Sequence, residues 1–536
     1  MSEPEIQGTE EITPGDDVAR RRTDRIRRRR IRTLVVVLLV LSLVITAGIL
    51  LLQRHREKQA RICPGLGDIA GPGYALSKRD EECIGWTTEQ DYAFSADIKD
   101  ITTKITAMNK SVSRRWSSPE QGRDPVPYVR VGVLMPMISD AGSAMSADTI
   151  RHSLEGIYTA QARANHPDRQ DFRSPNSVGV QVVLVNEGKL ATHWRTVVGQ
   201  LVDMSKAEHP LVAVVGLGIS IPEAKSAAEE LGRNGVVSIG GVITATDMVA
   251  NHFFKVSPSN VDYARALDHY LSSRPDLRSG FLVYDSNDDN FTRTLRQAFD
   301  TQLGNEFSLD RYRRSFTGTK KPHPTATPAM FGHTVNNICV AGADVVFYAG
   351  RERDLPALIG ALSQRTCNPY KPIAIAIGAT GLGRTQGDPA VLASLQASQL
   401  SVINASSTYS TDWTDGRQAP AGYRSFLDYF KTELKLSDEE LLDGYAIMHH
   451  DALATAIWAI RLAAEEKPPG SGPPATGDVI QSMNNMHGTE AVAAASGTLS
   501  FNDISNGWPH CKVVPIVHIP YRQTSGPTYQ TPCEQQ

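Results

Sequence analysis

The sequence offers little support for several common classes of function. Its net charge is only −3 over 536 residues, so the molecule as a whole lacks the basic character of a nucleic-acid-binding protein. None of its six cysteines stands in a CxxC pair, which disfavours zinc sites and thioredoxin-type redox sites. The motifs GxSxG and HExxH are absent, and no Cys/His arrangement suggests a nucleophile. We therefore expect no enzyme, no catalytic residue, no metal and no cofactor.

Length and composition indicate a folded protein of more than one domain. A chain of 536 residues exceeds the usual size of a single domain and predicts about two or three. An apolar share of 41%, with 31 prolines, is typical of a globular protein that buries a substantial core.

The N-terminal region contains a long apolar run without charge. Residues 1–17 are acidic and polar, which indicates a disordered tail, and residues 20–32 hold nine arginines. Residues 34–52 carry no charge over 19 positions, a length of about 28 Å as a helix, which matches a bilayer core. We predict a transmembrane helix at 34–52. The positive-inside bias places the N-terminus in the cytoplasm and everything after about residue 53 outside.

Three other interpretations of this region have less support. The apolar run is longer than the core of a usual signal peptide, and residues 53–59 offer no small-x-small cleavage site. No cysteine stands near the end of the run, which leaves a lipoprotein anchor unsupported. An arginine block also suits a nucleic-acid patch, but its position beside a membrane span favours a topology determinant attracted to anionic lipid.

All six cysteines follow the predicted helix, in the compartment where disulfides persist. Six cysteines allow 15 pairings. Their positions group them as Cys63 with Cys83, Cys339 with Cys367, and Cys511 with Cys533. The pair Cys339–Cys367 is the best supported, because a helix, a strand and a helix in succession place both residues at one edge of the same lobe.

Apolar runs of strand length alternate with helical segments from residue 128 onward. This alternation predicts parallel sheets with helices on both faces. The expected strands are 128–136, 178–186, 211–216, 235–240, 279–285, 343–350, 372–378 and 399–406, with a late pair at 497–503 and 512–521. The expected helices are 91–112, 146–165, 193–207, 221–231, 263–272, 291–303, 355–365, 423–434 and 444–466.

Residues 253–264 interrupt the alternation and predict a crossover between two α/β lobes. The expected layout is a cytoplasmic tail at 1–33, the membrane helix at 34–52, an extracytoplasmic stalk and linker at 53–127, lobe 1 at 128–256, lobe 2 at 257–402, completion of lobe 1 at 403–490, and completion of lobe 2 with the C-terminal tail at 491–536.

The stretch "VVGLGISIPEAKSAAEELGRNGVVSIGGVITATD", residues 214–247, begins like a nucleotide-binding loop. The third glycine of a GxGxxG fingerprint is replaced by Ile221, and no acidic residue ends a suitable next strand, so a nucleotide site is disfavoured. What remains is two hydroxyl-bearing turns after neighbouring strands, which suit a small anion such as a carboxylate. The alternative is that Ser220 and Thr244 are helix N-caps.

The order of motifs resembles the type I periplasmic binding proteins of the branched-chain amino acid receptor kind. The resemblance covers about residues 128–521 and rests on "VRVGVLMPM", "AVVGLGIS", "GVVSIGGVITATD", "FFKVSPSNVDYA", "FLVYDSNDDNFTRTLRQAF", "ADVVFYAGRERDLPALIGAL", "HHDALATAIWAI" and "GTLSFNDISNG". It implies a two-lobed clamshell that captures a small solute, often an amino acid, in the cleft between its lobes.

The resemblance also implies which residues hold the ligand. The turns at Ser220 and at residues 244–246 match those that bind the ligand carboxylate in the family. Phe291-Thr292 stands where a tyrosine followed by glycine is common, and His450-Asp451 stands where Tyr-Asp is usual. The residues that we expect at the ligand are Met137, Gly218, Ile219, Ser220, Thr244, Ala245, Thr246, Phe291 and Arg351.

Three classes of function suit this sequence to different degrees. A membrane-anchored solute-binding protein that delivers to an ABC permease explains the clamshell and its outward location. An outer sensor domain that signals through a partner protein is the alternative, because a transmembrane anchor is unusual for a plain binding protein. The best cluster for an enzyme or a metal site, residues 449–451, lies at adjacent helix positions that point in different directions.

Overall fold

The structure is a computed structural model, and the ranges that it describes cover most of the chain after residue 68. It describes residue 42 and residues 69–89, 92–119, 125–140, 143–166, 171–173, 178–319, 326–368, 370–468, 471–502, 506–522 and 528–533. The chain divides into two compact units, Met1–Ala60 and Arg61–Gln536, and the fold reported below belongs to the second. The arginine block, Cys63 and all but one residue of the predicted membrane segment lie outside the described residues. Within the described ranges, no helix combines the length and the apolar character that crossing a bilayer requires.

Eight strands form the sheet of the first lobe, in the order β1-β2-β3-β5-β4-β6-β7-β8. Strands β4 to β8 run parallel, β1 to β3 are antiparallel to one another, and β3 is antiparallel to β5. The strands span Ile69–Gly71, Tyr74–Arg79, Glu82–Thr87, Tyr128–Met135, Gly179–Asn186, Leu211–Ile219, Val237–Val242 and Phe253–Lys255 in chain order. Strands β5, β6 and β7 are buried at every residue, as a parallel sheet covered on both faces requires.

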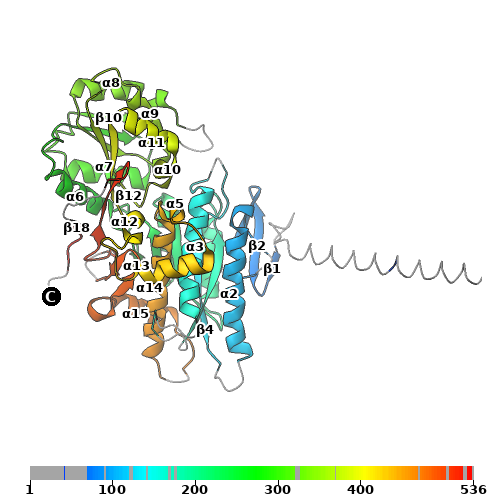
Figure 1. Ribbon diagram of the computed structural model, residues 1–536. Helices are drawn as coiled ribbons and strands as arrows, with labels where there is room; N and C mark the ends of the chain where they lie inside the picture. The colour runs from blue at the N-terminus through cyan, green and yellow to red at the C-terminus, as the bar shows by residue number, and fades with distance from the viewer. Residues whose placement is uncertain are drawn as a thin grey trace, which may run out of the picture. The chain divides into compact units, whose positions relative to one another are not determined.

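Helices cover both faces of this sheet. One face is covered by α2 (Lys99–Ser117), α3 (Ala147–Asn165), α14 (Tyr445–Glu465) and α15 (Thr476–Asn484), whose apolar residues share a core with β4, β5 and β6 (Figure 1). The other face is covered by α4 (Trp194–Met204) and α5 (Pro222–Arg233). The late helix α14 therefore returns to the first lobe, where it packs along α3.

The second lobe has a six-stranded sheet in the order β10-β9-β11-β12-β13-β17. Strands β9 (Gly280–Asp285), β10 (Arg313–Phe316), β11 (Val345–Ala349), β12 (Ile373–Ala379) and β13 (Leu400–Ser406) run parallel, and β17 (Ile516–Ile519) is antiparallel to β13. Helices α6 (Asn260–Leu271) and α7 (Asn290–Gln302) pack on one face. Helices α8 (Gly332–Ala341), α9 (Leu355–Ser363) and α11 (Pro389–Ala397) pack on the other (Figure 1).

Shorter elements complete the chain. They are the helices α10 (Gly383–Gly387), α12 (Ser410–Thr414) and α13 (Tyr423–Tyr429), the π-helical turn Phe430–Leu434, the 3₁₀ turns Ala96–Ile98, Pro328–Phe331, Glu352–Asp354, Asp438–Leu441 and Gly488–Glu490, and the strand pairs β14 (Val492–Ala494) with β15 (Gly497–Leu499) and β16 (Val513–Val514) with β18 (Tyr529–Gln530).

The segment that the sequence assigned to a stalk differs in the structure. Strands β1 to β3 extend the first-lobe sheet beyond β5, and α2 packs against α3 and β5. The physical reason is burial, because Ile84 and Ile105 contribute fully buried side chains to the cores of this lobe. Residues 69–89 and 92–117 are thus part of the first lobe and do not form a separate stalk.

Three other boundaries are refined. The chain passes from the first sheet at β8 to the second lobe at α6. Strand β13 reaches Ser406, so the second lobe extends past residue 402. Of the late strands, β15 pairs with β14 and packs with α14 in the first lobe, and β17 joins the second sheet.

Two of the three predicted disulfides are present among the described residues. Cys339–Cys367 joins the end of α8 to the segment after α9, with Cα atoms 5.7 Å apart. Cys511–Cys533 joins the segments that contain β16 and β18, with Cα atoms 4.4 Å apart. Cys83 is also disulfide-bonded, and its predicted partner Cys63 lies outside the described residues.

Candidate functional site

A cavity of about 170 Å³ lies where the C-terminal ends of parallel strands from both lobes face each other. Ligands of α/β proteins gather at such strand ends. The first lobe lines it with Ala144, Met145, Ser146, Thr149, Ile219, Ser220, Val242, Thr244 and Tyr445. The second lobe lines it with Phe291, Arg351, Glu352, Arg353, Ala379, Thr380, Gly381 and Arg384.

The first of the two predicted turns is a bulge within a strand. Strand β6 continues through Gly216, Leu217 and Gly218 to Ile219, and its register with β7 shifts between Gly216 and Ile219. All three residues from 216 to 218 have positive φ, at 94°, 56° and 58°. Glycine suits this backbone, and a Cβ at Gly216 would also lie 3.2 Å from the carbonyl oxygen of Leu134. The bulge carries the chain outward to Ser220.

Ser220 and Thr244 are not helix caps. The N-cap of α5 is Ile221, and it makes no side-chain cap bond. The Ser220 Oγ instead accepts hydrogen bonds from the backbone N–H groups of Thr244, at 3.1 Å, and Ala245, at 3.3 Å. Ser220 therefore fixes the second turn, and the cap interpretation is wrong for this pair.

The Thr244 hydroxyl is the polar group of this wall that stays unsatisfied. The residue is only 2% exposed, and its Oγ1 has no hydrogen-bond partner among the residues that the structure describes. It lines the cavity. A buried hydroxyl without a partner is costly, which marks a position where a ligand atom would be stabilised.

Phe291 and Arg351 form the opposite wall. Phe291 is the second residue of α7, whose N-cap Asp289 accepts from Thr292 N–H at 3.0 Å. The Arg351 guanidinium lies 5.1 Å from the centroid of the Phe291 ring. Its Nη2 donates to Asp289 Oδ2 and to the carbonyl oxygen of Ser220, both at 2.8 Å. Burial opposes the charge of Asp289, but Arg351 outweighs it and lowers the pKa of that carboxyl.

A second set of contacts joins the lobes beside the cavity. Asp247, which follows the second turn, accepts a hydrogen bond from Asn290 Nδ2 at 2.8 Å and pairs with Arg293 Nη2 at 2.5 Å. Asn290 and Arg293 belong to α7 of the second lobe. Together with the Arg351 bond to Ser220, these contacts tie the loops of one lobe to the helix start of the other.

Five of the nine residues expected at the ligand line the cavity, namely Ile219, Ser220, Thr244, Phe291 and Arg351. Four do not. Met137 is fully buried and its N–H donates to Asn186 Oδ1 at 2.9 Å. Gly218 lies in the β6 bulge, Ala245 donates to Ser220, and Thr246 is half-buried outside the lining. Whether any of the nine binds a ligand stays a prediction.

Sequence reasoning missed several polar residues of the lining. Glu352 and Arg353 directly follow Arg351, and Thr380 and Arg384 follow β12. Their positions after parallel strands were a usable signal. Tyr445, which the same cavity includes, begins a helix far along the chain, and only the packing of α14 against α3 brings it there.

Glu352 is committed to the second lobe. Its Oε1 accepts from the N–H groups of Arg384, at 3.0 Å, and Thr385, at 3.2 Å, at the start of α10. Burial raises the pKa of Glu352 to about 7, although these N–H groups act in the opposite direction. The carboxylate thus serves the N-terminus of α10.

The cluster at residues 449–451 is buried in the core of the first lobe. The His449 ring lies under the second turn, 3.2 Å from where a Cβ at Gly241 would be, and burial lowers its pKa to about 4. His450 Nδ1 lies 2.8 Å from Asp451 Oδ1, so these two neighbours do meet, contrary to the expectation for adjacent positions. Asp451 also accepts from Ser496 N–H at 2.7 Å. This is a structural network.

A second polar cluster joins α3 to the segment before α14. His152 lies between Asp443, at 2.7 Å from Nδ1, and Glu440, at 2.5 Å from Nε2. Arg151 pairs with Glu440 at 3.1 Å and Glu155 at 3.2 Å. Burial disfavours the charged ring, but the hydrogen bond and charge of Asp443, with the charge of Glu155, raise the pKa of His152 to about 9. Arg151 also pairs with Asp148 at 3.3 Å, so two cations face four carboxylates here.

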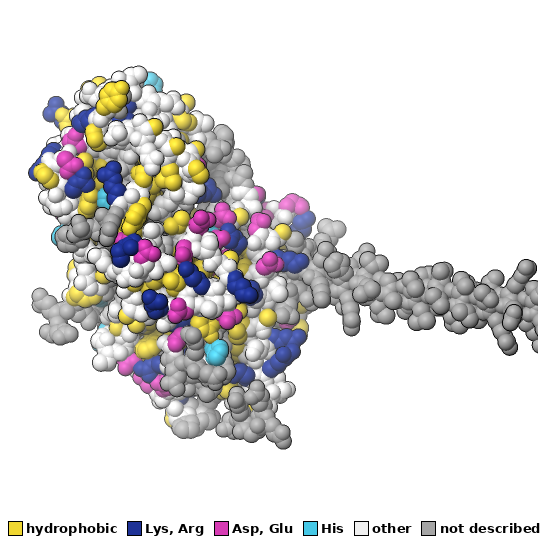
Figure 2. Space-filling model, viewed as in Figure 1, with side chains coloured by type: hydrophobic (Ala, Val, Ile, Leu, Met, Phe, Trp, Pro, Cys, Tyr) yellow, Lys and Arg dark blue, Asp and Glu magenta, His cyan; other side chains and the backbone are white. Residues whose placement is uncertain are grey.

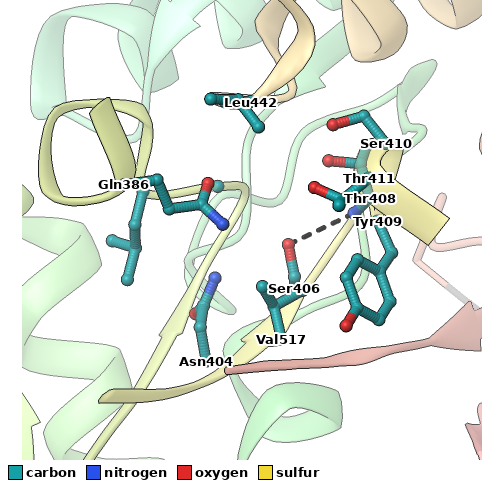
Figure 3. Close-up of a pocket in the computed structure, with 11 residues that line it drawn as sticks. Gln386, Asn404, Ser406, Thr408, Tyr409, Ser410, Thr411, Leu442 and Val517 are labelled. Carbon is teal, nitrogen blue, oxygen red and sulfur yellow. Dashed lines mark hydrogen bonds between the residues drawn. The ribbon is translucent and has the colours of Figure 1, made fainter. Parts of the chain in front are cut away.

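A smaller cavity of about 10 Å³, the space of about one water, lies behind the end of β12 (Figure 3). Asn404 and Ser406 face this cavity, and both also form hydrogen bonds to the backbone at the C-terminal end of β12. Asn404 Oδ1 accepts from Ala379 N–H at 3.0 Å, and Ser406 Oγ donates to the Thr380 carbonyl at 2.8 Å. This cavity is too small for a solute, but its residues fix a wall of the larger one.

Charged side chains of both signs are interspersed over the face seen in Figure 2. No stripe of Lys and Arg runs across the described part of that face. This distribution agrees with the low net charge of −3 and gives no footprint for a nucleic acid there.

Comparisons with known proteins place the fold. No protein-family model matches the chain, and no curated protein matches it. The branched-chain amino acid transporter substrate binding protein LivJ from Streptococcus pneumoniae, in complex with isoleucine, matches with a TM-score of 0.51 at 15% identity, over 73% of this chain and 95% of its own. An ABC transporter substrate-binding protein from Desulfitobacterium hafniense matches with a TM-score of 0.51 at 16% identity, over 75% and 99%.

A third structure differs in its ligand. The solute binding protein of an ABC transporter from Rhodopseudomonas palustris, in complex with 3,4-dihydroxy benzoic acid, matches with a TM-score of 0.52 at 13% identity, over 75% of this chain and 96% of its own. The two-lobed α/β fold of type I periplasmic binding proteins, which the motifs predicted, is therefore confirmed. These structures are described as binding proteins and not as enzymes.

Proposed function

We propose that the protein is a membrane-anchored, extracytoplasmic solute-binding protein that captures a small carboxylate-bearing solute in the cavity between its lobes. The observation that supports this most is the Thr244 hydroxyl, which lines the cavity, is 2% exposed and has no partner among the described residues. Ser220 fixes the backbone of the same turn. A ligand carboxylate supplies the acceptor that this hydroxyl lacks.

The location outside the membrane rests on two sequence features and on the cysteines. Residues 20–32 and 34–52 have the charge and length of a topology determinant and a membrane span. Disulfides such as Cys339–Cys367 persist in oxidising compartments, which suits an outward-facing domain. Delivery to an ABC permease is the role that the fold favours. The alternative role is an outer sensor that signals through a partner protein.

We do not propose an enzymatic role. The solved structures that share this fold are described as binding proteins, and the polar groups that line the cavity suit recognition of a ligand.

Ligand screening of the full-length protein in detergent tests the proposal. Amino acids, aliphatic acids and hydroxybenzoates are compared with neutral sugars and nucleosides, with the shift in melting temperature as the readout. A carboxylate at 100 times its Kd is expected to add about 2.7 kcal/mol of stability. Stabilisation by neutral solutes alone would contradict the carboxylate assignment.

Thr244→Val then tests the site, because valine keeps the shape and removes the hydroxyl. We expect binding of the best carboxylate to weaken by about 5- to 150-fold, the loss of one hydrogen bond worth about 1–3 kcal/mol. Thr301→Val is the matched control, since Thr301 is exposed on α7 and outside the lining. If both variants bind like the wild type, the site lies elsewhere.

A further inference from the structure

We propose that the solute carries a second acidic group, which Arg353 and Arg384 of the second lobe bind, so that the ligand class is a small dicarboxylate. This inference rests on the proposed function. It concerns the end of the ligand that faces the second lobe.

The charges that line the cavity are mostly positive. Three arginines, at 351, 353 and 384, line it, and Glu352 is the one carboxylate of the described lining. Arg351 is already neutralised, because it contacts Asp289 through Nε and Nη2 at 3.2 Å and 2.8 Å. The net charge that the cavity lining presents to a ligand is therefore set by Glu352, Arg353 and Arg384.

One of the two carboxyl oxygens of Glu352 is already engaged by the protein. Its Oε1 accepts two backbone N–H groups at the start of α10, and Thr385 Oγ1 lies 3.5 Å from the same oxygen. A cationic ligand group at this wall would also meet the guanidinium groups. The cavity is therefore poorly suited to the amino group of a simple amino acid.

Arg353 lacks an ion-pair partner in the described part of the chain. Its Nε is buried without a hydrogen-bond partner. The nearby carboxylates are used by others, since Asp285 Oδ1 accepts from Gly318 N–H at 2.9 Å and Asp354 Oδ1 accepts from Thr319 Oγ1 at 2.6 Å. Burial and the charge of Arg351 lower the pKa of Arg353, although the charges of Asp354, Asp289 and Asp285 act in the opposite direction.

Arg384 lines the same cavity and is exposed. Its backbone N–H is bound to Glu352, but no hydrogen bond or ion pair of its guanidinium appears among the described residues. Two guanidinium groups on one wall offer paired N–H donors in the geometry that matches a carboxylate. A dicarboxylate would thus satisfy Thr244 at one end and this pair of arginines at the other.

Isothermal titration of the full-length protein with matched acids tests the inference. The probes are succinate against butyrate and glutarate against valerate, with 4-aminobutyrate as the acid that carries an ammonium in place of the second carboxylate. We expect each diacid to bind about 10- to 150-fold more tightly than its monoacid, the effect of hydrogen bonds to charged groups. We expect 4-aminobutyrate to bind no better than butyrate.

Substitutions of the two arginines test whether these side chains cause the preference for diacids over monoacids. Arg353→Gln and Arg384→Gln are each expected to reduce the preference for the diacid several-fold, whereas Arg353→Lys retains part of it through its charge. Arg314→Gln is the control, because Arg314 is exposed on β10 and outside the cavity. A circular dichroism spectrum and a melting curve for each variant show that it is folded.

The outcomes separate the two proposals. If monoacids bind in a way that depends on Thr244 and diacids bind no better, the inference is overturned and the proposed function stands. Tighter binding of 4-aminobutyrate than of succinate would also overturn it. If neither these acids nor any other carboxylate of the screen binds, both are overturned.

Discussion

The Arg351 side chain of the second lobe donates a hydrogen bond from Nη2 to the backbone carbonyl of Ser220 in the first lobe, at 2.8 Å. The same guanidinium binds Asp289 and lies on the Phe291 ring. One side chain thus connects the turn that holds Thr244 to the helix start that forms the opposite wall. This contact ties the geometry of the cavity to the relative position of the two lobes.

Loss of this connection should loosen the first-lobe turn. In Arg351→Gln, the bond of a charged donor to Ser220 is lost, which is worth about 1.5–3 kcal/mol. We expect amides of the 220 and 244 turns to exchange about 10- to 150-fold faster where local opening governs exchange. Hydrogen exchange with mass spectrometry measures this, with Arg314→Gln as the control. Equal protection in both variants would show that the Arg351 contact does not hold the turn.

The His152 cluster predicts a pH dependence of stability. The pKa of His152 is raised to about 9 in the folded protein, so its contribution is fully present below its unfolded pKa of about 6.5 and is lost as the pH rises through about 9. We expect the wild type to exceed His152→Gln in melting temperature by several degrees at pH 6. The difference should shrink steadily toward pH 10.

The charged neighbours of His152 sharpen this test. Glu155 and Arg151 face it from α3, and Glu440 and Asp443 face it from the opposite segment. These groups remain in His152→Gln. The difference in melting temperature between the two proteins therefore reports the protonation of the His152 ring alone. A difference in melting temperature that stays constant from pH 6 to pH 10 would mean that His152 is not charged in the folded state.

The Cys339–Cys367 disulfide should stabilise the second lobe. It closes a loop with a sequence separation of 28, for which the chain-entropy model gives about 3–4 kcal/mol. We expect the double variant Cys339→Ser/Cys367→Ser to melt several degrees below the wild type. Peptide mapping without reductant checks the pairing itself, and free thiols at these positions would contradict it.

The proposed topology is tested on intact cells. A protease added outside is expected to digest the chain beyond about residue 60, because the arginine block keeps the N-terminus in the cytoplasm. A tag fused to the N-terminus should survive as a protected fragment. Protection of the large domain, or loss of the tag, would refute this orientation.

The sequence by itself determined the α/β architecture. Continuous apolar runs such as residues 178–186 and 211–216 are typical of strands in a sheet covered on both faces, and the helices between them follow from apolar periodicity. The eight main strands accordingly lie within about two residues of their predicted starts. Ser220 and Thr244 were placed at the ends of neighbouring strands by the same logic.

Other features depend on partners that are distant in the chain, which no local pattern encodes. Strands β1 to β3 join the first sheet because β5 offers an open edge, and the local sequence only marks them as short and interrupted by glycine. Arg353, Arg384 and Tyr445 reach one cavity from three separate segments. Whether Ser220 caps a helix or the neighbouring turn was decided by the tertiary structure, because the β6 bulge aims its hydroxyl at the N–H groups of Thr244 and Ala245.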